Sequence, residues 1–121
     1  MARKFTRADF AQQNDFCWGC HWPKNGPRED KFQLQTHELV GGAMRKKALR
    51  EPATYTRLCN TCHAHLPPLV ELLALKKIMD PEHYSREKIL DLRHEAHTAI
   101  TEAQVTRAVK RILKRSPPAA F

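Results

Sequence analysis

The sequence lacks an apolar run long enough to cross a membrane. Its most apolar stretch, residues 66–75, is interrupted by two prolines and by Glu71, whereas a membrane-spanning helix needs about 20 consecutive apolar residues. The basic N-terminal segment 1–5 is followed by no apolar run, so it does not have the pattern of a secretory signal. We therefore expect a cytoplasmic protein with no membrane partner.

Acidic residues are also scarce. The chain of 121 residues carries 13 Asp and Glu against 21 Lys and Arg, which gives a net charge of +8. Such an excess favours polyanionic partners, of which nucleic acid is the commonest. A chain of this length forms one domain with a limited hydrophobic core, so a metal ion that joined distant segments would add useful stability.

Cysteine occurs at only four positions, and these form two Cys-x-x-Cys pairs, Cys17 with Cys20 and Cys59 with Cys62. In a reducing compartment such pairs are more often zinc ligands than disulfides. Four thiolates complete the tetrahedral shell that Zn²⁺ takes in structural sites. The sequence therefore predicts one structural zinc ion, bound by all four cysteines.

A different cofactor remains open at this point. Both pairs are followed by a histidine, at His21 and His63, and Cys-x-x-Cys-His is the attachment motif of c-type haem. A two-haem electron carrier would use these histidines as axial ligands. The high basicity and the missing secretory signal speak against this alternative.

Helix and strand signals alternate in the first half of the chain. Thr6 has the properties of an N-cap for a short helix over 7–13. The alternation of apolar and polar residues over 32–36 predicts a strand, and the strand-forming residues 54–58 predict another that leads into the second cysteine pair.

The last third of the chain has helical periodicity. Apolar residues recur at helix spacing over 69–79 and again after Ser85. No Pro or Gly interrupts 85–115, so this segment forms one long helix or breaks and folds back. Its end, 107–115, carries five positive and no negative charges, which fits either the solvated face of a helix or a phosphate-binding face.

Four short runs follow one another between and after the cysteine pairs: His37-Glu38-Leu39-Val40, Gly41-Gly42, Glu51-Pro52-Ala53-Thr54 and Leu58-Cys59-Asn60-Thr61-Cys62-His63. In this order they resemble the HNH endonuclease family, a branch of the ββα-metal nucleases. The resemblance covers 16–66 and implies an α+β fold. Together with the length and the helix signals, it leads us to expect a single domain over 1–121, with a zinc-braced ββα core at 16–66, an N-terminal helix, a helical extension at 67–115 and a flexible tail at 116–121.

The resemblance also implies roles for individual residues. His37 would be the general base that activates water at the scissile phosphate, a role suited to imidazole near neutral pH. His63 would bind a catalytic divalent ion, Mg²⁺, Mn²⁺ or Ni²⁺. Thr54 stands at the position of the family's middle Asn, which orients the loop that carries the base. The four cysteines would hold the structural zinc.

DNA, duplex or branched, is the partner that the resemblance implies. A basic stretch would contact its backbone without reading sequence, through Arg45, Lys46, Lys47 and Arg50. The family association suggests a phage or mobile-element protein, active in the cytoplasm of a bacterial host cell. A homodimer or a larger phage-encoded assembly is compatible with the helical C-terminal third.

Two threonines favour a second interpretation. Thr36 replaces the Asp or His that often precedes the catalytic histidine, and a hydroxyl is a weaker ligand for a hard cation than a carboxylate. Thr54 replaces the Asn and lacks the paired donor and acceptor of an amide. A catalytically inactive, zinc-stabilised DNA-binding or protein-interaction module therefore remains open beside the nuclease.

Overall fold

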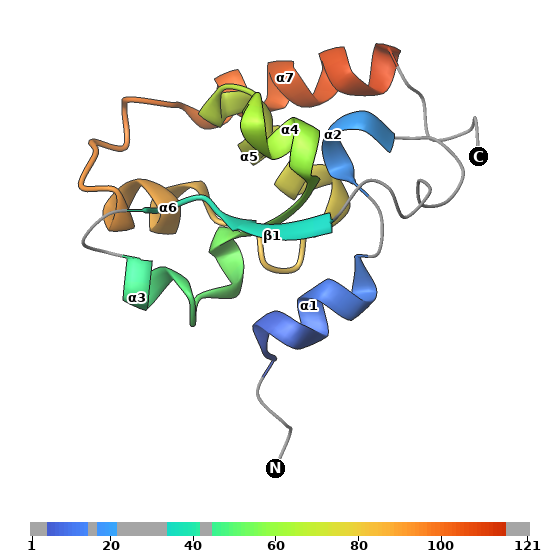
Figure 1. Ribbon diagram of the computed structural model, residues 1–121. Helices are drawn as coiled ribbons and strands as arrows, with labels where there is room; N and C mark the ends of the chain where they lie inside the picture. Colours follow the sequence, from blue (N-terminus) through green and yellow to red (C-terminus); the bar gives the residue numbers. More distant parts are fainter. Residues whose placement is uncertain (1–4, 15–16, 22–33, 42–44, 116–121) are drawn as a thin grey trace.

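The computed structural model describes residues 5–14, 17–21, 34–41 and 45–115, which combine helices with one two-stranded sheet (Figure 1). This confirms the α+β class. The predicted tail 116–121 lies outside the described residues, as do the side chains of Cys20, His21, Arg45 and Arg115. The elements, in chain order, are α1 (Arg7–Gln13), α2 (Trp18–His21), β1 (Leu34–Glu38), α3 (Arg45–Ala48), the 3-10 helix η2 (Pro52–Thr54), β2 (Tyr55–Cys59), α4 (Asn60–Ala64), α5 (Leu69–Met79), α6 (Arg86–Leu92) and α7 (Glu102–Arg115).

Helix α1 begins where the sequence predicts. Thr6 Oγ1 accepts a hydrogen bond from Asp9 N at 3.2 Å, and Thr6 N donates to Asp9 Oδ2 at 2.8 Å. This reciprocal capping box satisfies two backbone donors at the start of the helix. The helix ends at Asn14, whose side chain donates to Phe10 O.

The sheet is an antiparallel pair in which Thr36 lies opposite Arg57 and His37 opposite Thr56. The second strand starts at Tyr55, one residue later than predicted. Thr54 belongs instead to η2, because Pro52 starts this turn and the Glu51 side chain caps it.

Aromatic rings join the N-terminal segment to the sheet. Phe10 lies 5.5 Å from both Trp18 and Tyr55, measured between ring centroids. Around this cluster, buried apolar side chains from β2, α5, α6 and α7 complete one continuous core, and they include Leu58, Leu72, Leu73, Ile89, Val105 and Ile112. In Figure 1, α1 lies on one side of β1, and α4 and α7 lie on the other.

The segment 85–115 folds back rather than forming one long helix. Helix α6 ends at Leu92, and His94 adopts the left-handed conformation with φ 59°. The return to α7 is held by Arg86 Nη1, which donates to the carbonyl oxygens of His97 and Ile100. Across the described ranges, no helix is both long and apolar enough to span a bilayer.

Candidate functional site: a cysteine cluster beside a histidine-lined cleft

Three of the four cysteines meet at one point. The Sγ atoms of Cys17, Cys59 and Cys62 all lie within 4.8 Å of one another. Cys17 immediately precedes α2, Cys59 ends β2, and Cys62 lies in α4. Cys20 is in α2, but its side chain lies outside the described residues.

The spacing of these thiols fits a shared metal ion. Tetrahedral Zn²⁺ with Zn–S bonds of about 2.3 Å places its sulfur ligands about 3.8 Å apart, so a small contraction would bring the cluster onto one ion. Cys62 N donates to Cys59 Sγ at 3.4 Å, so a backbone N–H already faces this sulfur. The structure thus has a cysteine cluster that could hold a metal.

Gly19 lets α2 approach this cluster. A Cβ atom at Gly19 would lie 3.0 Å from Cys62 Sγ and 3.6 Å from the Leu58 side chain. A methyl group there would press on a sulfur atom that a metal ion would hold in place. The absence of a side chain is therefore a requirement of the close approach between α2 and α4.

His37 and His63 face each other next to the cysteine cluster. Their ring centroids lie 5.0 Å apart with an interplanar angle of 64°. His37 comes from β1, and His63 follows Cys62 directly in α4. Burial lowers the pKa of His37, and His63 lowers it further, whereas Glu38 raises it.

Both histidines line an open cleft of about 790 Å³. All five residues of β1 contribute to its wall, together with α1, β2 and α4. Because successive strand residues point to opposite faces, a cleft lined by the whole strand runs along its outer edge. The lining residues that carry charge or can bind a proton are Arg7, His37, Glu38, Arg57 and His63.

Arg7 and Arg57 place positive charge on this cleft. Arg7 Nη2 donates to Thr36 O at 2.9 Å and to Glu38 Oε2 at 3.3 Å. Arg57 Nη1 donates to Thr36 Oγ1 at 3.0 Å, and its Nε donates to Asn14 O at 2.9 Å. Neither arginine is among the sequence-predicted site residues, because Arg7 reaches β1 only through the packing of α1, and Arg57 only through the pairing of β2 with β1.

Glu38 supplies an oxygen without a partner. Its side chain is 6% exposed, and Oε1 is buried with no hydrogen-bond partner in the described part of the chain. A buried carboxylate oxygen left in this way is costly. It therefore suits a water molecule or a hard cation, for which carboxylate oxygen is a preferred ligand.

Thr54 does not line the cleft but braces the end of β1. Its side chain is buried, and its hydroxyl lies 2.8 Å from Ala48 O and 2.9 Å from Glu51 O. Its carbonyl accepts from Leu39 N at 2.8 Å, and Leu39 O in turn accepts from Arg93 Nη1 at 2.9 Å. Leu39, two residues after His37, thus has both its backbone N–H and its backbone C=O hydrogen-bonded.

The predicted backbone-binding residues lie away from the cleft. Lys46, Lys47 and Arg50 are exposed in and after α3, and none of them lines the cleft. The side chain of Arg45 lies outside the described residues.

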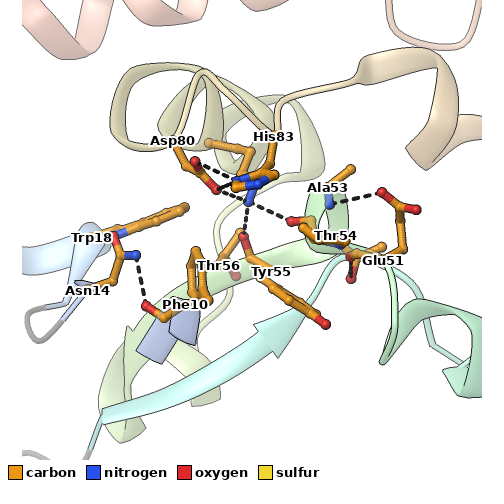
Figure 2. A network of polar contacts seen from close by, with 12 residues as sticks. Phe10, Asn14, Trp18, Glu51, Ala53, Thr54, Tyr55, Thr56, Asp80 and His83 are labelled. Atoms are coloured by element: carbon orange, nitrogen blue, oxygen red, sulfur yellow. Dashed lines mark hydrogen bonds and ion pairs between the residues drawn. The ribbon is translucent and has the colours of Figure 1, made fainter. Parts of the chain in front are cut away.

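Lys76 is a buried cation that no pattern in the sequence indicates. Its side chain is 0% exposed, and Nζ donates to Pro52 O at 2.8 Å, Tyr55 O at 2.8 Å and Asp80 Oδ2 at 2.7 Å. His83 Nδ1 contacts the same Asp80 carboxylate (Figure 2). Burial lowers the pKa of Lys76, and the hydrogen bond with Asp80 raises it. Helix α5 is thereby tied to the junction of η2 and β2.

Comparisons with known proteins give no further identification. No protein-family model, no curated protein and no solved structure matches this chain. What can be said of function therefore depends on the residues and their arrangement.

Proposed function

We propose that the chain is a metal-dependent DNA endonuclease of the HNH type. The observation that carries the proposal is the meeting of His37 and His63, with ring centroids 5.0 Å apart, in a cleft directly beside the cysteine cluster. His37 lies in β1 and His63 in α4, with β2 between them in the chain, so the elements follow the order strand, strand, short helix. That order is the one that the resemblance to the ββα-metal nucleases implies.

His37 is the proposed general base. It accepts a proton from a water molecule as the water oxygen attacks phosphorus and the bond to the leaving oxygen breaks. Arg7 and Arg57 stand on the same cleft and would oppose the negative charge of the phosphate. Thr54 and Arg93 act indirectly, since they fix the backbone just after His37.

Two metal ions belong to the proposal. The cysteine cluster, whose sulfur atoms lie within 4.8 Å of one another, fits a structural Zn²⁺. His63 would hold Mg²⁺, Mn²⁺ or Ni²⁺ in the cleft, with Glu38 on the same cleft as a further candidate ligand. When bound, this second ion supplies positive charge to the phosphate and the leaving oxygen.

The test is plasmid cleavage with each of the three ions. We expect the parent protein to cut, and His37→Ala to cut about 100-fold to 10,000-fold more slowly, which is the usual contribution of a general base. His97→Ala is the matched control, because His97 is exposed and pairs only with Asp91 at the surface among the described residues. Equal cleavage by the parent and His37→Ala would exclude His37 as the base.

One observation favours the catalytically inactive module. Thr36 Oγ1 is occupied by Arg57, so this hydroxyl is not available as the metal ligand that the family often has at this position. A protein that cuts with none of the ions, yet binds DNA with a steep salt dependence, would establish this alternative. The two-haem alternative loses support, because both cysteine pairs contribute to a single cluster.

A further inference from the structure

Helix α7 presents a basic face on the surface of the protein. Its apolar residues Val105, Ala108 and Ile112 are buried. Its exposed side carries four cations, for which no acidic partner occurs among the described residues, namely Arg107, Lys110, Arg111 and Lys114. The acidic residue of α7, Glu102, lies at its start and pairs with Lys77 and Arg86.

A groove of about 420 Å³ lies between this helix and the start of α5. Leu69, Val70 and Ile100 contribute apolar surface to it. Arg107 and Arg111, one turn apart on α7, contribute two guanidinium groups. Two guanidinium groups at this spacing suit successive anionic groups along a chain, because each can donate two hydrogen bonds to a phosphate.

The groove is close to the histidine-lined cleft. Pro68, which also lines the groove, is only five residues after His63. Five residues of fully extended chain span at most about 18 Å. Helix α5, which begins directly after Pro68, packs against α7, so a strand bound at His63 can continue toward α7.

We propose that the groove and the basic face of α7 hold the phosphate backbone of the DNA strand on one side of the phosphate that occupies the histidine-lined cleft. A single strand of duplex DNA has one phosphate per about 3.4 Å of helix axis, so a distance of at most about 18 Å corresponds to about five nucleotides. This inference rests on the proposed function in one respect, that the partner is DNA.

The character of the exposed face favours nucleic acid over a protein partner. A helix that docks onto another protein usually presents large apolar anchors. In the described part of the chain the one large apolar side chain classed as exposed is Leu66, which is not on α7. The free face of α7 offers positive charge instead, and positive charge attracts a polyanion.

The test compares DNA binding by two variants of equal net charge, both in the His37→Ala background so that cleavage does not interfere. One is Arg107→Gln with Arg111→Gln. The control is Lys77→Gln with Lys88→Gln, which removes two surface charges outside the groove. Binding of a labelled DNA duplex is measured by fluorescence anisotropy over a range of salt concentrations.

We expect the arginine variant to reduce the slope of log K against log salt by about 2, and to weaken binding at least about tenfold at low salt, because each lost phosphate contact changes the slope by about 0.9. The control should keep the slope of its parent. An unchanged slope in the arginine variant would overturn the inference, and that result is also expected if the groove serves an acidic protein.

A second measurement separates this inference from the proposed nuclease activity. With His37 intact, the arginine variant should cleave plasmid more slowly but hydrolyse bis(p-nitrophenyl) phosphate at the parental rate, because this small phosphodiester cannot reach α7. If the arginine variant lost activity equally on both substrates, the cleft itself would be damaged, and the proposed contact between α7 and DNA would be overturned. A parent that hydrolyses neither substrate, with the salt slope still reduced in the arginine variant, would refute the nuclease and retain the inference.

Discussion

Replacing Lys76 by Met tests whether the buried ammonium group holds the helical third of the chain to the sheet. Met fills a similar volume but cannot donate a hydrogen bond. The substitution removes the three hydrogen bonds that Nζ donates to Pro52 O, Tyr55 O and Asp80 Oδ2. Two backbone carbonyl groups would then lack their charged donor, and Asp80 would lack its cation.

The size of the loss follows from these contacts. Removing one partner of a buried ion pair typically costs about 3–5 kcal/mol of unfolding free energy. Asp80 is 15% exposed and keeps His83 as a partner, which lowers the cost, whereas a buried carbonyl left unsatisfied adds about 1–3 kcal/mol. We therefore expect Lys76→Met to lower the free energy of unfolding by about 3–5 kcal/mol.

Urea unfolding followed by circular dichroism measures this difference. Lys77→Met is the matched control, since Lys77 is the next residue on α5 but pairs with Glu102 at the surface. A surface pair contributes about 0–1 kcal/mol, so the control should change little. If the two variants lost equal stability, or if Lys76→Met lost less than about 1 kcal/mol, the anchoring role of Lys76 would be wrong.

Three further predictions concern the metal cluster and one half-buried tyrosine. Removing metal with a strong chelator should lower the melting temperature by more than about 10 °C, and Zn²⁺ should restore it; a melting curve indifferent to both would exclude a bracing ion. Gly19→Ala should weaken Zn²⁺ affinity in a competition titration, although Ala favours a helix, because the new Cβ would lie 3.0 Å from Cys62 Sγ; an affinity equal to that of the parent would contradict this crowding. Burial and the hydrogen bond to Glu102 raise the pKa of Tyr84 above its ordinary value of 10.0, so the stabilisation present below pH 10 should be lost as the pH rises toward the folded-state pKa. The free energy of unfolding of Tyr84→Phe, measured in urea, should therefore fall less steeply above pH 10 than that of the parent. If the two free energies fell in parallel, the contribution assigned to Tyr84 would be wrong.

The sequence predicts those parts of the fold that depend on local signals. Thr6 and Asp9 form the expected capping box, and the periodic segment 69–79 is the helix α5. The separation of α6 from α7 is also indicated by nearby residues in the sequence. Thr101 and Gln104 exchange hydrogen bonds at the start of α7, in the Thr-x-x-Gln pattern that is typical of a capping box.

The remaining features depend on contacts between distant segments. Arg7 reaches the cleft because α1 packs beside β1, and Arg57 reaches it because β2 pairs with β1. Lys76 has the sequence environment of an exposed helix residue, and its burial becomes intelligible only with the carbonyl groups of Pro52 and Tyr55 beside it. Periodicity indicates which face of a helix is apolar, but it does not reveal which backbone oxygens a neighbouring segment presents.

The position of Lys76 on α5 limits how far the protein can be truncated. A fragment ending at residue 66 would retain every cysteine and both facing histidines, yet it would lose the ammonium group that binds Pro52 O and Tyr55 O. It would also lose Arg93, which binds Leu39 O two residues after His37. A shortened chain that keeps both contacts must therefore extend at least through α6 and Arg93, well beyond the stretch that resembles a nuclease.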